Sequence, residues 1–122
     1  MKYLLIMNIN PATMATLTEE EREAIGAGHQ KFMDTITETG EMIVTQALAD
    51  PSNTLTVQTK NGVQVVTDGP YIEAKEFMGG FYLVECESKE RAVELAKMIP
   101  DTKHDGFGVE VRPVMFSHGL EM

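Results

Sequence analysis

Two segments of this chain carry apolar side chains on both faces of an alternating pattern, which constrains the fold more than any other feature. The segment from Lys2 to Ile9 has two apolar faces, formed by Tyr3, Leu5 and Met7 and by Leu4 and Ile6. The segment from Phe81 to Cys86 has the same character. Because such strands need cover on both sides, both segments are predicted to be interior strands of a sheet.

The first helix is predicted from its capping residues. Thr18 is followed three residues later by a glutamate, which is the pattern of a capping box, so a helix begins there. It is predicted to run to Thr39, with Gly40 ending it in a left-handed conformation. Gly26 and Gly28 each weaken its middle by about 1 kcal/mol relative to alanine, so a bend or break is expected near them.

A second helix follows the later interior strand. Ser88 can cap its start, and Pro100 stops it. Between them the apolar residues recur three and four positions apart, at Ala92, Leu95, Ala96 and Ile99. This spacing predicts a helix with one face on the core.

The remaining segments are predicted strands. Met42 to Ala49 is apolar without helical spacing, and Val109 to Met115 is the last strand-like run. Thr54 to Thr59 and Val63 to Thr67 alternate on either side of Lys60-Asn61-Gly62. Because Asn-Gly supplies the positive φ angles of a type I′ turn, these two runs are predicted to form a β-hairpin.

The predicted order is strand, helix, strand, hairpin, strand, helix, strand. It corresponds to an α+β fold, a ferredoxin-like split β-α-β arrangement with a β-hairpin inserted between its halves. Right-handed crossovers place both helices on one face of an antiparallel sheet. Residues 1–122 are expected to form a single domain. Since the interior strands are apolar on the other face as well, two copies are predicted to pack sheet to sheet as a homodimer.

Charge and composition disfavour several classes of protein. With 10 basic and 19 acidic residues the formal net charge is −9, so no nucleic-acid partner and no membrane surface is expected. No apolar run reaches the length of a membrane span or a signal peptide. Cys86 is the one cysteine, and the three histidines are not closely paired. We therefore expect a cytoplasmic protein without a metal site, and the sequence has no glycine-rich nucleotide-binding motif that would indicate a cofactor.

His29 is the first candidate for catalysis. It lies on the apolar stripe of the first predicted helix, together with Ile25, Phe32, Met33 and Ile36. A polar ring on such a stripe needs a hydrogen-bond partner. The sequence leaves two interpretations open, namely general acid–base catalysis by His29 and a core histidine that is hydrogen-bonded to the backbone.

The stretch from Val66 to Phe81 is well placed to line a pocket, because Gly69-Pro70 stiffens a turn that is rich in polar side chains. Asp68 precedes this turn at a strand end. Its predicted catalytic role is to orient His29 or to bind a substrate hydroxyl. The alternative is that its carboxylate only caps the turn, as aspartates commonly do.

Further polar residues are candidates for binding a substrate. Glu73, Lys75 and Glu76 form a mixed-charge cluster, in which Lys75 would bind an anion and Glu76 would accept a proton; otherwise they are solvated surface residues. Tyr71 and Tyr82 can bind through their rings and hydroxyls, or they can simply pack with the hydroxyl at the edge of water. Arg112 can hold a carboxylate ligand, or it can form an interface salt bridge with an acid.

Several motifs together resemble the DGPF-domain branch of the YCII-related family. They are Asp68-Gly69-Pro70-Tyr71-Ile72-Glu73-Ala74-Lys75-Glu76, then Gly79-Gly80-Phe81-Tyr82, then Ala92, Ala96 and Pro100, and finally Val109-Glu110-Val111-Arg112-Pro113-Val114. Tyr71 stands where the branch has phenylalanine. The resemblance implies a dimeric α/β-barrel in a small bacterial cytoplasmic protein, and His29 matches the position that is suspected of catalysis in relatives.

Two functional hypotheses follow from the residues and the resemblance. The first is a cofactor-independent enzyme that transfers a proton on an aromatic-derived or lactone-like small molecule, with His29 as acid or base and Asp68 and the Lys75-Glu76 pair orienting groups. The second is a non-catalytic, regulatory or small-molecule-binding dimer, linked through the resemblance to sigma-factor signalling. The sequence does not decide between them.

Overall fold

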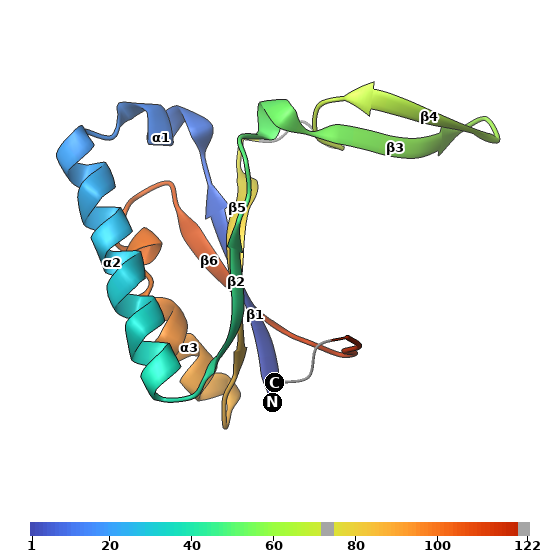
Figure 1. The fold of residues 1–122 in the computed structure, drawn as a ribbon. Coiled ribbons are helices and arrows are strands. Elements are labelled where there is room, and N and C mark those ends of the chain that lie inside the picture. Colours follow the sequence, from blue (N-terminus) through green and yellow to red (C-terminus); the bar gives the residue numbers. More distant parts are fainter. Residues whose placement is uncertain (72–74, 120–122) are drawn as a thin grey trace.

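The computed structural model describes residues 1–71 and 75–119. Its elements follow one another in the order shown in Figure 1: β1 (Lys2–Ile9), α1 (Pro11–Thr16), α2 (Glu19–Glu38), β2 (Met42–Ala47), η1 (Pro51–Asn53), β3 (Leu55–Lys60), β4 (Val63–Asp68), β5 (Phe77–Glu85), α3 (Lys89–Met98), η2 (Pro100–Lys103) and β6 (Gly108–Pro113). The elements η1 and η2 are short 3₁₀ helices.

Four of the strands form one antiparallel sheet in the order β2-β5-β1-β6. Both long helices, α2 and α3, cover the same face of this sheet (Figure 1). This is the ferredoxin-like α+β arrangement that the sequence predicts, and the prediction is confirmed. The inserted hairpin of β3 and β4 forms a separate two-stranded sheet, which projects away from the four-stranded one on the side opposite the helices (Figure 1).

The start of α2 is fixed by the predicted capping box. The Thr18 hydroxyl accepts a hydrogen bond from the Glu21 amide at 3.0 Å, and the Glu21 carboxylate accepts one from the Thr18 amide at 2.9 Å. Gly40, with φ at +81°, follows the end of the helix. The helix runs without interruption from Glu19 to Glu38. The expected bend or break near its two glycines is therefore wrong, because the rest of the helix is held by packing as well as by propensity.

The hairpin turn also has the predicted geometry. Asn61 and Gly62 both have positive φ angles, 51° and 81°. Lys60 and Val63 face each other directly across the turn. Positive φ at both central residues is the mark of a type I′ turn, whose twist matches that of the two strands it joins.

The hydrophobic core lies between the helices and the sheet. Six of its side chains are 0% exposed, namely Leu5 on β1, Ile36 on α2, Val84 on β5, Ala92 and Leu95 on α3, and Ile99 directly after α3. Residues on one face of a strand alternate with residues on the other. Tyr3, Leu5 and Met7 therefore face the helices, where they are buried.

The opposite face of the sheet carries a second apolar group. The strand register places Leu4 opposite Leu83 and Ile6 opposite Phe81, and all four point away from the helix layer. Val44 of β2 lies on the same face, opposite Leu83, and is 37% exposed. No helix of the described chain covers this face (Figure 1). Both faces of the central strands are thus apolar, as the sequence indicates.

Some element boundaries differ from the predicted ones. The segment after Asn10 is a helical turn, α1, because the Asn10 side chain accepts hydrogen bonds from the Ala12 and Thr13 amides. β5 begins at Phe77 and runs through Gly79 and Gly80, which the sequence assigns to a loop. Gly80 lies where β5 and β2 approach closely. A Cβ atom at this position would lie 2.6 Å from the Gln46 carbonyl oxygen, so only glycine allows the two strands to come this near.

Candidate functional site

A cavity of about 380 Å³ lies between α2 and the helix-facing side of the sheet, at the end of the sheet near α1. Most of its lining is apolar and comes from Met7, Ile9, Met14, Ile25, Met33, Leu48 and Phe107. A small polar group lines it as well, formed by His29, Thr45, Gln46, Tyr82 and Asp101. A mainly apolar hollow with a few converging polar groups is the usual form of a small-molecule site.

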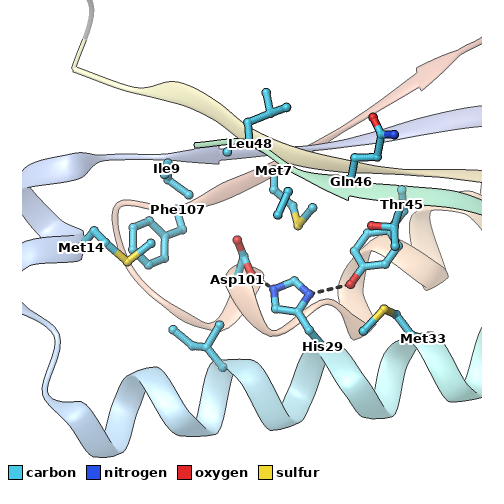
Figure 2. A pocket seen from close by; sticks show the side chains of 14 residues that line it. Met7, Ile9, Met14, His29, Met33, Thr45, Gln46, Leu48, Asp101 and Phe107 are labelled. Atoms are coloured by element: carbon cyan, nitrogen blue, oxygen red, sulfur yellow. Dashed lines mark hydrogen bonds and ion pairs between the residues drawn. The ribbon is translucent and has the colours of Figure 1, made fainter. Parts of the chain in front are cut away.

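His29 links the polar groups of this cavity. Its Nε2 atom lies 2.7 Å from an Asp101 carboxylate oxygen, and its Nδ1 atom lies 2.7 Å from the Tyr82 hydroxyl (Figure 2). The three residues come from α2, η2 and β5, so the fold brings them together from distant parts of the sequence. We call them the His29 triad.

The chemistry of the partners defines how the protons are arranged. A carboxylate can only accept a hydrogen bond, so Nε2 of His29 carries a proton and donates it to Asp101. In the neutral imidazole, Nδ1 is then an acceptor, and the Tyr82 hydroxyl donates to it. Both ring nitrogens of His29 therefore have a protein partner, and the order of donation runs from Tyr82 through His29 to Asp101.

Packing holds the triad in place. The Tyr82 ring stacks beside the His29 ring, with 5.9 Å between the centroids and an interplanar angle of 14°. Phe32 meets the same tyrosine edge to face, at 4.8 Å and 85°. Tyr82 is 2% exposed. Burial, and next the negative charge of Asp101, raise the pKa of the Tyr82 phenol to about 12, so the hydroxyl keeps its proton at neutral pH.

Asp101 reaches His29 because α2 and η2 approach each other closely. A methyl group on Gly28 would lie 2.9 Å from the Cβ atom of Pro100, which is closer than real side chains pack. Pro100 begins η2 and directly precedes Asp101, and both are buried. Because position 28 is a glycine, η2 can pack against α2 closely enough to bring the Asp101 carboxylate beside the His29 imidazole.

Of the side chains that the sequence singles out for catalysis or binding, the structure places His29 and Tyr82 in the cavity lining. Asp68 ends β4, opposite Leu55 at the base of the hairpin, and the structure does not bring it to His29. Its assignment to catalysis stays a prediction. Asp101 occupies the position beside the imidazole that the sequence analysis gives to Asp68.

The remaining residues predicted to bind a substrate lie outside this cavity. Tyr71 is 71% exposed, and Lys75 and Glu76 are exposed on the loop before β5. Arg112 is exposed on β6, opposite Leu4 on the sheet face that the helices do not cover. Glu73 belongs to residues 72–74, outside the described part of the chain. Their roles in binding stay predictions.

Sequence reasoning missed one member of the triad, Asp101, which follows a helix-stopping proline and has no motif around it. The sequence does name Tyr82 as a candidate for binding, and its alternation with Val84 on an interior strand fits the helix-facing side, but the strand pattern does not give its partner His29.

Metal and membrane features are limited in the part of the chain that the structure describes. No three His, Cys, Asp or Glu side chains there come together in a way that could hold a metal ion. None of the helices described is long and apolar enough to cross a membrane. The cytoplasmic location stays a prediction.

Comparison with known proteins adds a family and a relative. The family model described as YCII-related domain matches residues 1–116. An uncharacterised protein of Rhizobium meliloti (strain 1021), R00369, is 25% identical over 114 residues, which cover 93% of this chain and 92% of that protein. Neither finding carries an activity with it.

Proposed function

This chain belongs to the YCII-related family, and from the geometry of its cavity we propose that it binds a small, mainly apolar molecule and transfers a proton on it, with His29 as the acid–base group. The observation that carries the proposal is the His29 triad, in which both hydrogen bonds of the imidazole measure 2.7 Å. The two partners fix the orientation of the imidazole, and a histidine side chain can serve as a general acid or base without a bound cofactor.

The substrate class agrees with the lining of the cavity. An aromatic-derived or lactone-like molecule has an apolar body and one or two oxygen atoms. Met7, Met14 and Phe107 supply apolar contacts, and the triad supplies the polar ones. Methionine side chains adapt to the shape of an apolar ligand, and their sulfur atoms pack well against aromatic rings.

Hydrogen–deuterium exchange tests the proposal. A panel of substituted phenols, hydroquinones and unsaturated lactones is incubated in D₂O with the protein, and loss of carbon-bound protons is followed by NMR. We expect catalysed exchange for part of the panel, reduced by about 10²-fold or more in His29→Asn, the usual effect of losing a general acid–base group. Gln30→Ala, next to His29 but exposed on the solvent side of α2, is the matched control and should leave the rate unchanged. Exchange that survives in His29→Asn contradicts the assignment.

A second candidate function is non-catalytic binding of a small molecule. It is favoured by the complete hydrogen bonding of His29, since a histidine with two protein partners is also a stable structural element. Ligands that bind in the cavity but show no exchange across the whole panel would support this candidate over the first.

We also propose that the protein is a homodimer formed by the uncovered sheet face. The centre of this face is apolar, with Leu4, Ile6, Phe81 and Leu83. Charges of both signs surround them, namely Lys2, Glu85, Glu110 and Arg112. A two-fold axis can therefore place acids of one copy against bases of the other while the apolar centres meet. The hairpin, on the same side, would then lie beside the partner.

Sedimentation tests the dimer. We expect the wild-type protein to sediment as a dimer at micromolar concentration, and Leu83→Lys to dissociate it, because the substitution puts a charge at the apolar centre. Val93→Lys, on the exposed side of α3, is the control and should remain dimeric. A wild-type monomer at these concentrations contradicts the proposal.

A further inference from the structure

The carboxylate of Asp101 has one oxygen atom that His29 does not use. The other oxygen, Oδ1, binds His29. No further hydrogen bond to this side chain is formed within the described chain, and no side-chain nitrogen or oxygen atom there is both fully buried and unbonded. The second oxygen therefore retains access to the cavity that Asp101 lines, and Figure 2 shows it turned away from His29.

The other two members of the triad have no such free position. Both ring nitrogens of His29 form hydrogen bonds, and the Tyr82 hydroxyl donates its one proton to Nδ1. A ligand in the cavity accordingly meets the free Asp101 oxygen before it meets the imidazole. Because a carboxylate oxygen only accepts hydrogen bonds, the ligand must supply a donor there.

The rest of the lining restricts the charge of the ligand. The cavity wall contains no lysine and no arginine among the described residues, so nothing in it balances a ligand carboxylate or phosphate. The Asp101 carboxylate and the net charge of −9 both repel anions. An anionic ligand would also have to give up its water in a mainly apolar space, which is costly without a partner.

The volume sets the size of the ligand. A cavity of about 150 Å³ is sufficient for benzene. The cavity beside the triad measures about 380 Å³, which leaves room for one substituted ring or two fused rings.

We propose that the ligand is an uncharged phenol or enol of one or two rings, whose hydroxyl donates to the free Asp101 oxygen. The inference rests on the proposed function and names the atom through which the triad holds its ligand. The hydrogen bond to Asp101 places the ligand hydroxyl beside His29, which stays the acid–base group of the proposed function.

Four probes of similar size test the ligand class: phenol, toluene, benzoate and benzylamine. Their binding to the full chain at neutral pH is measured by NMR titration. We expect phenol to bind about tenfold or more tightly than toluene, the effect of one hydrogen bond to a charged acceptor, and benzoate to bind least. Benzylamine, as a cation, should bind more weakly than phenol, because the apolar wall does not compensate its desolvation.

Two variants separate this inference from the proposed function. Asp101→Asn keeps the shape but removes the charge, and it should lower the affinity for phenol about tenfold while leaving that for toluene unchanged. Asp105→Asn removes the same charge from a nearby exposed position and should change neither. The inference is overturned if benzoate or benzylamine binds as tightly as phenol, if Asp101→Asn leaves the phenol affinity unchanged, or if none of the probes binds. Binding with this selectivity but without deuterium exchange would leave the inference standing and remove the proposed catalysis.

Discussion

The four-stranded sheet and the β3–β4 hairpin use the same kinds of side chain with opposite results. Leu5 and Val84, in the sheet, are 0% exposed, whereas Leu55, Val57 and Val66, in the hairpin, are each 64% exposed. Both regions have regular antiparallel pairing. The difference is that α2 and α3 cover one face of the sheet, while no element of the described chain packs over the hairpin (Figure 1). The local sequence is therefore sufficient for strand pairing here, whereas burial of the strand side chains requires that helices pack over them.

The same difference explains where the candidate site forms. The His29 triad needs side chains from a helix, a strand and a 3₁₀ turn. These meet only between the helices and the sheet face that they cover, which we call the covered layer. There Tyr82 is 2% exposed, and burial, followed by the charge of Asp101, raises the pKa of its phenol to about 12. The hairpin and its adjoining loop carry Asp68, Tyr71 and Lys75, but in solvent these groups have weak effects on one another.

Core truncation gives the largest expected contrast between the two regions. Leu95→Ala removes a side chain that is 0% exposed and should lower the free energy of unfolding by about 2–5 kcal/mol. Val57→Ala in the hairpin should cost less than about 1 kcal/mol, mostly through strand propensity. Urea unfolding followed by circular dichroism measures both. Equal losses would show that the hairpin is packed as tightly as the core, and a Val57→Ala loss that depends on protein concentration would show that a second copy does the packing.

Two glycines of α2 offer a sharper test within the covered layer. Gly28→Ala places a methyl group 2.9 Å from Pro100 and should cost about 1–3 kcal/mol through overpacking. It should also push Asp101 from His29, which NMR detects as a shift of the imidazole resonances. Gly26→Ala is the matched control, because nothing lies within 4 Å of the added methyl group. It should stabilise the helix by about 1 kcal/mol. Similar effects of the two substitutions would mean that α2 and η2 are not in close contact.

The sequence predicts the elements and the location of His29 well because these depend on short-range patterns. Thr18, Gly40 and Asn61-Gly62 define their caps and turns within a few residues, and the apolar stripe of α2 places His29 toward the sheet. The partner of His29 could not be predicted, because Asp101 is 72 residues away in the chain and reaches it only through the contact of Gly28 with Pro100. Asp68 attracts attention through its motif, yet no local pattern tells that the hairpin turns away from the helices.

Alkaline titration compares the buried Tyr82 with the exposed Tyr71. The pKa of Tyr82 is raised to about 12, chiefly by burial, so the unfolded chain ionises first as the pH rises above 10. The free energy of unfolding is therefore unaffected by Tyr82 ionisation below pH 10 and falls between about pH 10 and 12. Ultraviolet titration of tyrosinate should therefore show a phase near pH 12 that Tyr82→Phe removes and Tyr71→Phe retains. Tyr82→Phe should also cost about 1 kcal/mol at neutral pH through the lost hydrogen bond to His29. Loss of the phase in Tyr71→Phe instead would place the buried hydroxyl elsewhere.

The smallest expected effect concerns the ion pair that ties α3 to the start of β2. Arg91 donates from Nε and from one terminal nitrogen to the two carboxylate oxygens of Glu41, each at 2.9 Å, and the Glu41 side chain is 14% exposed. These hydrogen bonds lower the pKa of Glu41 below 4.5, although burial opposes them. The pair therefore stabilises the fold above the pH at which the unfolded glutamate titrates, and this contribution is lost as the pH falls through the lowered pKa.

Glu41→Gln should accordingly reduce the free energy of unfolding by up to about 1 kcal/mol at neutral pH, with a difference from wild type that shrinks as the pH falls below 4.5. Urea unfolding at a series of pH values measures this. Glu94→Gln is the matched control, since Glu94 lies 4.0 Å from the same arginine but its side chain is 65% exposed, so its removal should be close to neutral. If both substitutions have the same small effect at every pH, the covered layer gives this pair no advantage over an exposed one, and the contrast with the hairpin then rests on apolar burial alone.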